Sequence, residues 1–203
     1  WDIGAEAVTR RMAASIGCAC VIQPYSRLVI DCNRPPGAHD SIPEVSDGTT
    51  VHGNLGLDDT RRNARVNEIF QPYHDALADR LDRVPRRVAV SIHSFTPHFN
   101  GASRPWDIGF LFRKDEHTSA RLAEILRSEN PDLHIGMNQP YQIDDLSDWF
   151  VPQHGEARGL PHSLIEIRND HIDTPEGQDR WADMLAATLR RWLEGALAQR
   201  DIR

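Results

Sequence analysis

Three polar sites, each beside a strand-like apolar run, carry side chains suited to hydrolysis. Asn33 and Arg34 follow one such run, His93 ends a second, and Glu166 interrupts a third. A buried parallel strand has a continuous apolar sequence, and ligands of an open α/β sheet bind at the carboxyl ends of its strands. Together at one sheet edge, these residues would supply an anion clamp, a metal ligand or base, and a general base. The pattern predicts a hydrolase that acts on a carboxylated amide.

Arg34 precedes a proline, Pro35, which holds the preceding residue in an extended conformation. Arg34 would then be fixed where the strand ends, with its guanidinium free to bind a carboxylate through two parallel hydrogen bonds. The alternative is an ion pair with Asp31 that ties the loop together, and the residues favour the two interpretations about equally. Arg27, at the start of the same run, offers a second guanidinium, for which a structural ion pair is the stronger interpretation.

His93 and Glu166 each have a structural and a functional interpretation. A buried histidine is more often a hydrogen-bonded core residue than a ligand, but His93 stands at a strand end before a long loop. There, a neutral imidazole could bind zinc or act as a base. Glu166 shares a strand face with Arg168 and could simply pair with it. In the functional interpretation Glu166 is a general base whose pKa is tuned by burial and a neighbouring metal.

Familiar catalytic motifs are missing from the sequence. It contains no His-x-x-His, His-x-x-Glu or His-Glu-x-x-His pattern, no glycine-rich phosphate loop, and no Gly-x-Ser-x-Gly nucleophile elbow. Nothing in the sequence therefore indicates Ser-His-Asp chemistry. His74 falls within a predicted helix, where we expect surface or core filling.

Strands alternate with helices along the chain, which predicts an α/β domain with a largely parallel sheet. We expect one domain over residues 1–203, with a mostly parallel mixed sheet and helices on both faces. The irregular stretches 35–56 and 138–159 are long enough to suggest functional loops. The predicted strands are 19–22, 28–30, 87–92, 108–112 and 163–167, and the predicted helices are 4–16, 58–81, 118–128 and one that starts at Pro175.

Composition excludes some classes of protein. The chain has 203 residues and a net charge of −7, so no basic surface offsets nucleic-acid phosphates. No apolar run reaches the roughly 18 to 20 residues of a membrane helix. Three cysteines are too few for a disulfide framework and suggest a reducing compartment, the cytoplasm. Because the sequence opens at Trp1 without a methionine, we also expect a missing N-terminal segment.

Several segments in the same order resemble the N-formylglutamate amidohydrolase family. They are residues 1–5, 31–35, 91–97, 138–141 and 160–168, so the resemblance covers essentially the whole chain. That family is similar in fold to zinc carboxypeptidases. The resemblance implies hydrolysis of N-formyl-L-glutamate to formate and glutamate, with zinc polarising the formyl carbonyl.

The resemblance also implies a role for each matching position. Asn33 and Arg34 would hold the substrate carboxylate, His93 would ligate zinc, and Glu166 would be the catalytic base. Apart from the resemblance, we expect Arg27 or Arg104 to help Arg34 fix the carboxylate of the small-molecule substrate, and Asn138 and Tyr141, in an irregular segment, to line the pocket.

One part of the family pattern is missing here. The carboxypeptidase-like site needs an early histidine ligand, which this sequence lacks; Asp2 could supply only a carboxylate ligand. Two ligands rarely hold zinc, whose sites use three protein ligands and water. Two alternatives therefore stay open, a non-catalytic relative that binds a carboxylated ligand and a carboxypeptidase-like peptidase.

Overall fold

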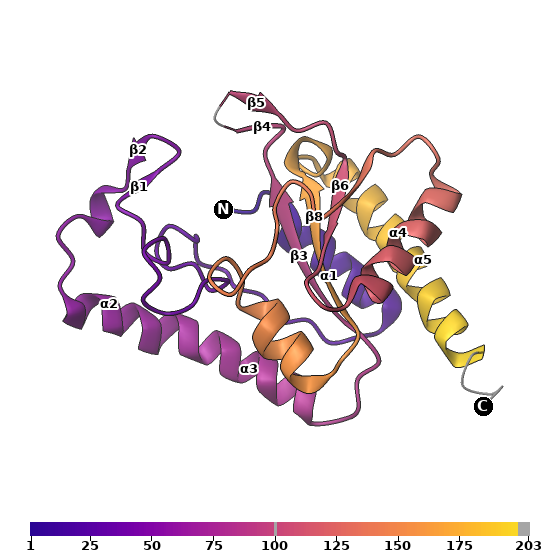
Figure 1. Cartoon of the computed structure of the whole chain (residues 1–203), viewed down its shortest axis with the longest axis horizontal. Helices are drawn as coiled ribbons and strands as arrows, with labels where there is room; N and C mark the ends of the chain where they lie inside the picture. The colour runs from indigo at the N-terminus through magenta and orange to yellow at the C-terminus, as the bar shows by residue number, and fades with distance from the viewer. Residues whose placement is uncertain (100, 199–203) are drawn as a thin grey trace.

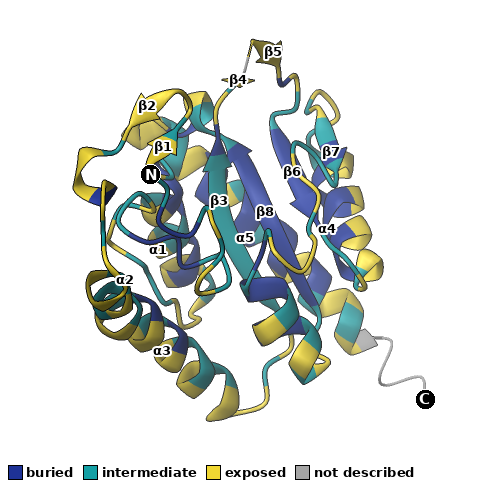
Figure 2. Cartoon of the chain, turned by 60° about the vertical axis from the view of Figure 1, so that its left-hand side comes forward, coloured by how far each residue is buried: buried dark blue, intermediate teal, exposed yellow. Residues whose placement is uncertain are grey.

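A four-stranded mixed sheet forms the centre of the chain, whose computed structural model describes residues 1–99 and 101–198. The strand order is β3-β8-β6-β7; Figure 1 labels β3, β8 and β6, and Figure 2 also labels β7. Strand β3 pairs with β8 in parallel, as β6 does with β7, while β6 and β8 are antiparallel. The predicted mixed, mostly parallel sheet is therefore confirmed. The strands are β3 (Ala89–Phe95), β6 (Ile108–Leu111), β7 (Ile135–Met137) and β8 (His162–Arg168).

Three helices cover one face of this sheet, and they are α1 (Ala5–Ile16), α4 (Glu116–Glu129) and α5 (Pro175–Ala198). Helix α5 packs against both α1 and α4. The sheet presents Phe110 and Ile165 to this layer, and Trp181 of α5 is buried with them. Burial of these apolar side chains drives the packing. Figure 2 shows β6 and β8 as largely buried and β3 as intermediate.

The opposite face of the sheet is covered by a helical turn of the π type, Val151–Gly155. Val151 packs there against Leu111 of β6 and Leu164 of β8. Helix α3 (Gln71–Asp82) also contacts this turn. Helical structure thus lies on both faces, as the sequence predicts.

The predicted helix 58–81 is a continuous helical run with an unpredicted change of pitch. It consists of α2 (Asp59–Arg65), a π-helical turn (Val66–Phe70) and α3. The Asp58 carboxylate caps the run by accepting a hydrogen bond from the backbone N–H of Arg61 at 2.8 Å. Phe70 buries its ring against Trp149 in a second small core.

Two predicted strands are wrong. Residues 19–22 and 28–30 form no strand in the described part of the chain. The backbone of Val29 is used elsewhere, since its N–H donates to Ser26 O at 2.9 Å and its carbonyl accepts from Arg65 at 2.6 Å. A turn and a side chain have therefore replaced strand pairing here.

The predicted irregular stretches contain short elements of their own. A hairpin of β1 (Val45–Ser46) and β2 (Thr49–Thr50) precedes a short 3-10 helix, His52–Asn54. A second hairpin joins β4 (His98–Phe99) and β5 (Ala102–Ser103). Further 3-10 turns are Glu156–Arg158 and Asn169–His171. No described helix has the length and apolarity needed to cross a membrane.

Candidate active site

His93 and Glu166 are neighbours on one face of the sheet. They are register partners across the parallel pair β3–β8, so their side chains project to the same side. Gly109 of β6 is the partner of Glu166 on the other flank. A Cβ atom on Gly109 would lie 1.8 Å from the carbonyl oxygen of Gln139. Only glycine therefore lets the 138–141 loop lie this close to Glu166.

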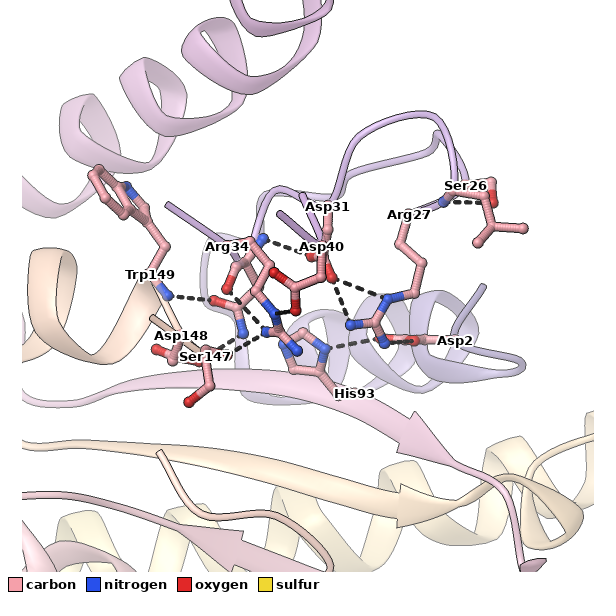
Figure 3. Close-up of polar contacts among 12 residues, drawn as sticks. Asp2, Ser26, Arg27, Asp31, Arg34, Asp40, His93, Ser147, Asp148 and Trp149 are labelled. Carbon is pink, nitrogen blue, oxygen red and sulfur yellow. Dashed lines mark hydrogen bonds and ion pairs between the residues drawn. The ribbon is translucent and has the colours of Figure 1, made fainter. Parts of the chain in front are cut away.

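A carboxylate from the start of the chain binds His93. Asp2 Oδ2 lies 2.8 Å from His93 Nδ1, and Ser91 Oγ lies 2.8 Å from His93 Nε2. Figure 3 shows the Asp2 and His93 side chains in contact above β3. The hydroxyl of Ser94 also donates to the carbonyl of Ile3 at 2.9 Å, which ties the Asp2 segment to the strand.

A glycine makes this approach possible. Gly4 precedes α1 with φ of 77°, and a Cβ atom there would lie 2.1 Å from the carbonyl oxygen of Ile172. Both the left-handed backbone and the close contact require glycine. Gly4 therefore fixes the direction in which Asp2 leaves the helix.

Burial and charge shift the pKa values of these groups in opposite ways. Burial raises the pKa of Glu166 to about 7, against the opposing effect of the His93 and Arg27 charges. Burial alone would lower the pKa of His93, but the hydrogen bond and charge of Asp2 outweigh it and raise that pKa to about 9. Oε2 of Glu166 is buried and finds no hydrogen-bond partner in the described ranges. Glu166 can therefore exchange a proton near neutral pH.

Arg27 connects this face of the sheet to the 31–34 loop. Its guanidinium donates to Asp31 Oδ2 at 2.6 Å and lies 3.7 Å from Asp2 Oδ1 (Figure 3). Asp31 Oδ1 in turn accepts the backbone N–H of Asn33 at 2.9 Å. Arg27 forms an ion pair with Asp31, so Asp31 pairs with Arg27 rather than with Arg34, and a role for Arg27 in binding substrate stays a prediction.

The side chains of Asn33 and Arg34 bond to their own surroundings. Asn33 Nδ2 donates to Asp148 Oδ2 at 2.6 Å, and its Oδ1 accepts two backbone N–H groups, those of Trp149 and Phe150, at 3.1 and 3.0 Å. Arg34 donates to Asp40 Oδ2 at 2.9 Å and also to the Ser147 carbonyl. Both residues join the 31–34 loop to residues 147–150. A role for either in binding substrate stays a prediction.

Arg104, Tyr141 and Asn138 lie around the other side of Glu166. The guanidinium of Arg104 is 4.8 Å from the Tyr141 ring and 4.5 Å from the Phe99 ring, and it donates to the Tyr141 hydroxyl at 2.9 Å. Such cation–π contacts hold a buried guanidinium in place. Asn138 Oδ1 accepts the backbone N–H of Phe112 at 2.9 Å, which shapes the loop.

A cavity of about 740 Å³ opens between α1, α3 and β3. Asp2, Arg27 and His93 line its polar end, and Asn33 also borders it. The structure therefore brings Asp2, Arg27 and His93 to one cavity, with Glu166 beside His93 on the sheet. Arg104 and Tyr141 approach from the Glu166 side, and burial together with the Glu166 charge raises the pKa of Tyr141.

The two predicted zinc ligands, Asp2 and His93, lie side by side in the structure. Asp2 and His93 are adjacent, as two ligands of one ion must be. Within residues 1–99 and 101–198, however, no group of three or more histidine, cysteine, aspartate or glutamate side chains is placed to hold a metal. The described residues supply two predicted ligands and do not by themselves fit a complete zinc site.

Sequence reasoning missed Ser91 and Asp148. Ser91 lies two residues before His93, and strand alternation could have placed its hydroxyl on the same face. Asp148 is buried, and burial raises its pKa despite hydrogen bonds from Val151 and Asn33. No local pattern marks Asp148, because its partner Asn33 is far away in the chain.

The family model for N-formylglutamate amidohydrolase (FGase) matches residues 1–172. The crystal structure of gene product Atu2144 from Agrobacterium tumefaciens superposes with a TM-score of 0.87 at 34% identity, covering 97% of this chain and 79% of that one. N-formylglutamate amidohydrolase from Ralstonia eutropha JMP134 gives a TM-score of 0.48 at 18% identity, over 66% of this chain and 54% of that one. No curated protein matches this chain.

Proposed function

This chain belongs to the N-formylglutamate amidohydrolase family, and on that premise we propose that it hydrolyses N-formyl-L-glutamate to formate and glutamate. The observation that carries the proposal is the environment of Glu166. Its carboxyl group is buried beside His93, and burial raises its pKa to about 7. A general base with a pKa near the working pH is the group that amide hydrolysis by water requires.

Glu166 acts on the attacking water. It takes a proton from the water while the water oxygen bonds to the formyl carbon, and it then passes that proton to the departing amine nitrogen. The C–N bond breaks, which leaves formate and the free amino group of glutamate. A rigid strand position suits this double role, because the carboxyl group must face both the water and the leaving nitrogen.

Three arginines supply the positive charge for the substrate carboxylates. Arg27 borders the cavity beside His93, and Arg104 lies on the Glu166 side with Tyr141. Arg34 and Asn33 frame the loop that carries this end of the cavity. Because N-formylglutamate has two carboxylates, more than one guanidinium is needed to fix it.

Zinc stays a prediction, in which Asp2 and His93 would supply two ligands of a site that the described residues do not complete. Binding would require His93 to give up the proton that it now shares with Asp2, because a zinc-bound imidazole is neutral. Metal analysis of protein purified without chelators tests this point. Stoichiometric zinc supports it, and zinc-free protein with full turnover overturns it.

Cytoplasmic localisation also stays a prediction and rests on the three cysteines, which are free.

A second candidate mechanism is favoured by the hydrogen bonds of His93. Asp2, His93 and Ser91 form the chain of contacts expected of a serine nucleophile with its base, and the His93 pKa of about 9 means that such a base would become neutral only at high pH. The Ser91→Ala variant separates this mechanism from the one above, as described in the Discussion.

The Glu166→Gln variant tests the proposed function. We expect kcat for N-formyl-L-glutamate to fall by about 10²- to 10⁴-fold with little change in KM, since the amide keeps the shape but cannot accept the proton. The matched control is Glu124→Gln on the exposed surface of α4, where turnover should be unchanged. Equal kcat for Glu166→Gln and wild type would overturn the assignment.

The same assay separates the alternatives. A non-catalytic relative would bind N-formylglutamate without turnover in the wild-type protein. A carboxypeptidase-like peptidase would instead cleave a dipeptide with a free carboxyl terminus faster than N-formylglutamate.

A further inference from the structure

Two buried histidines, His74 of α3 and His154 of the Val151–Gly155 turn, lie against each other, and His74 also borders the cavity of the candidate active site. Their exposed fractions are 6% and 5%. The rings are stacked with planes 9° apart, and His74 Nδ1 lies 2.8 Å from His154 Nε2. The proposed reaction uses neither of them.

The hydrogen-bond partners define which ring nitrogens carry protons. His74 Nε2 lies 2.8 Å from the carbonyl oxygen of Cys32, which can only accept, so Nε2 must donate. Nδ1 of a neutral His74 is then an acceptor, and His154 Nε2 donates to it. His154 Nδ1 is left as an acceptor, and it faces Arg158 Nη1 at 3.4 Å. Arg158 can only donate and is held by Asp82 at 2.8 Å. Three contacts therefore run in one direction, from Arg158 through His154 and His74 to the Cys32 carbonyl, while Asp82 accepts a separate hydrogen bond from Arg158.

Both histidines depend on unusual helix geometry. His154 lies within a π-helical turn, and His74 follows the π-helical turn Val66–Phe70 by four residues. Such turns form well under 1% of residues in globular proteins and are frequent at functional sites. Here each one sets the angle at which a helix presents its histidine, so two segments far apart in sequence meet.

We call the hydrogen-bonded chain Arg158–His154–His74–Cys32 the relay. The relay ends on the 31–34 loop, which carries the candidate binding residues. Cys32 lies between Asp31, which binds Arg27, and Asn33, which donates to Asp148. Asp148 Oδ1 in turn accepts from the N–H of Val151 at 2.6 Å, at the start of the turn that holds His154. The 31–34 loop is thus joined to the same turn at two points, by Asn33 through Asp148 and by Cys32 through the histidine pair.

We propose that His74 and His154 are positioning residues that hold the backbone of residues 31–34, and through it Arg27 and Arg34, in the geometry that binds a substrate carboxylate. The inference rests on the proposed function, because carboxylate binding by this loop is part of that proposal. Neither histidine is assigned a catalytic role.

Two conservative variants of His74 separate positioning from simple core packing. Glutamine places its amide nitrogen near the histidine Nε2 position, so His74→Gln keeps the donor to the Cys32 carbonyl. Asparagine reproduces the Nδ1 position, so His74→Asn can bond His154 but cannot reach Cys32. We expect His74→Asn to raise KM by about tenfold with kcat within about twofold, and His74→Gln to stay close to wild type.

Two variants of His154 test the same hydrogen bond to Cys32 indirectly, through their effect on His74. His154→Gln keeps the donor to His74 Nδ1, whereas His154→Asn removes it. Without that donor, His74 is free to carry its proton on Nδ1 and lose its bond to Cys32. The ¹⁵N NMR spectrum should then report the Nε2-protonated form of His74 in wild type and His154→Gln, and a changed form in His154→Asn.

Equal KM values for His74→Gln and His74→Asn would overturn the proposal, as would a fall in kcat at constant KM. A merely structural role would lower Tm in both variants without separating their KM values. Failure of the proposed function has a different signature, namely no turnover of N-formylglutamate by wild type. The relay is then judged by calorimetric binding of glutamate, where His74→Asn must bind more weakly than His74→Gln, and equal affinities overturn it.

Discussion

The strand face that carries Glu166 and the loop that carries Asn33 are built in opposite ways. Glu166 sits on a regular strand, where its backbone is fixed by both neighbouring strands while its buried Oε2 has no partner in the described part of the chain. Asn33 sits in irregular backbone, and both polar atoms of its side chain are bonded. A regular strand can hold a polar group in an unfavourable environment, whereas a loop needs polar bonds to hold its own shape.

The largest expected difference in stability comes from Asn33→Ala. This change removes the partner of the backbone N–H groups of Trp149 and Phe150 and of Oδ2 of the buried Asp148, and we expect a loss of about 3 kcal/mol in the free energy of unfolding. Glu166→Gln should instead leave stability unchanged or raise it, because burying a neutral amide costs less than burying a carboxylate. Urea unfolding of both variants measures the contrast. A larger loss for Glu166→Gln than for Asn33→Ala would break the comparison.

Gly4→Ala tests how far the strand face depends on its neighbouring segment. A methyl group would meet the Ile172 carbonyl on a left-handed backbone, so we expect a loss of about 2 kcal/mol and lower activity as Asp2 moves away from His93. Gly195→Ala in α5 is the control, since nothing lies within 4 Å of its added Cβ atom. Helix propensity predicts that the control gains up to about 1 kcal/mol. Thermal unfolding distinguishes the two, and similar Tm shifts would contradict this account.

Acid should lower the free energy of unfolding, because the buried pair His74 and His154 that contacts the 31–34 loop resists protonation in the folded protein. Burial lowers the pKa of His74 and of His154 to about 4, although Asp75 and Asp82 oppose the effect and Arg158 adds to it at His154. In the unfolded chain both histidines take up protons below about pH 6.5, whereas the folded protein keeps them neutral. The unfolded state therefore binds more protons, and stability falls as pH drops from about 6.5 to 4, by about 2 to 3 kcal/mol for each histidine. Urea unfolding at pH 7 and pH 4.5 checks this, with His74→Gln expected to show a smaller loss.

Ser91→Ala is expected to have the smallest effect. If Ser91 only orients His93, losing one hydrogen bond should lower kcat by less than about tenfold. A serine nucleophile would instead be essential, and its loss would cost about 10⁴-fold or more. Steady-state kinetics on N-formylglutamate decide between these outcomes, and trapping of a covalent acyl-enzyme in the wild type would favour the nucleophile.

Much of the sheet could be predicted from the sequence, because β3, β6 and β8 are continuous apolar runs. The neighbourhood of His93 and Glu166 follows from strand alternation once those strands are recognised. Residues 28–30 have the same apolar character, but Arg65 and a local turn take up the backbone of Val29. The conformation of residues 28–30 therefore depends on hydrogen bonds to groups outside the segment, which a local sequence pattern cannot predict.

The sequence predicts His74 as surface or core filling, and the structure buries it on α3. Its contact with His154 could not be predicted, because it depends on packing between distant segments. Its partner His154 belongs to a segment predicted to be irregular. The bonds of Asn33 to residues 148–150 likewise depend on tertiary contact alone.

Trp149 gives this arrangement an optical consequence. Its backbone N–H bonds Asn33, and its indole ring lies 6.1 Å from the ring of His74. A protonated imidazole quenches a nearby indole by accepting an excited electron, whereas a neutral one does so weakly. The chain has five tryptophans, so the difference in emission between wild type and Trp149→Phe should report the charge on His74 without any added label.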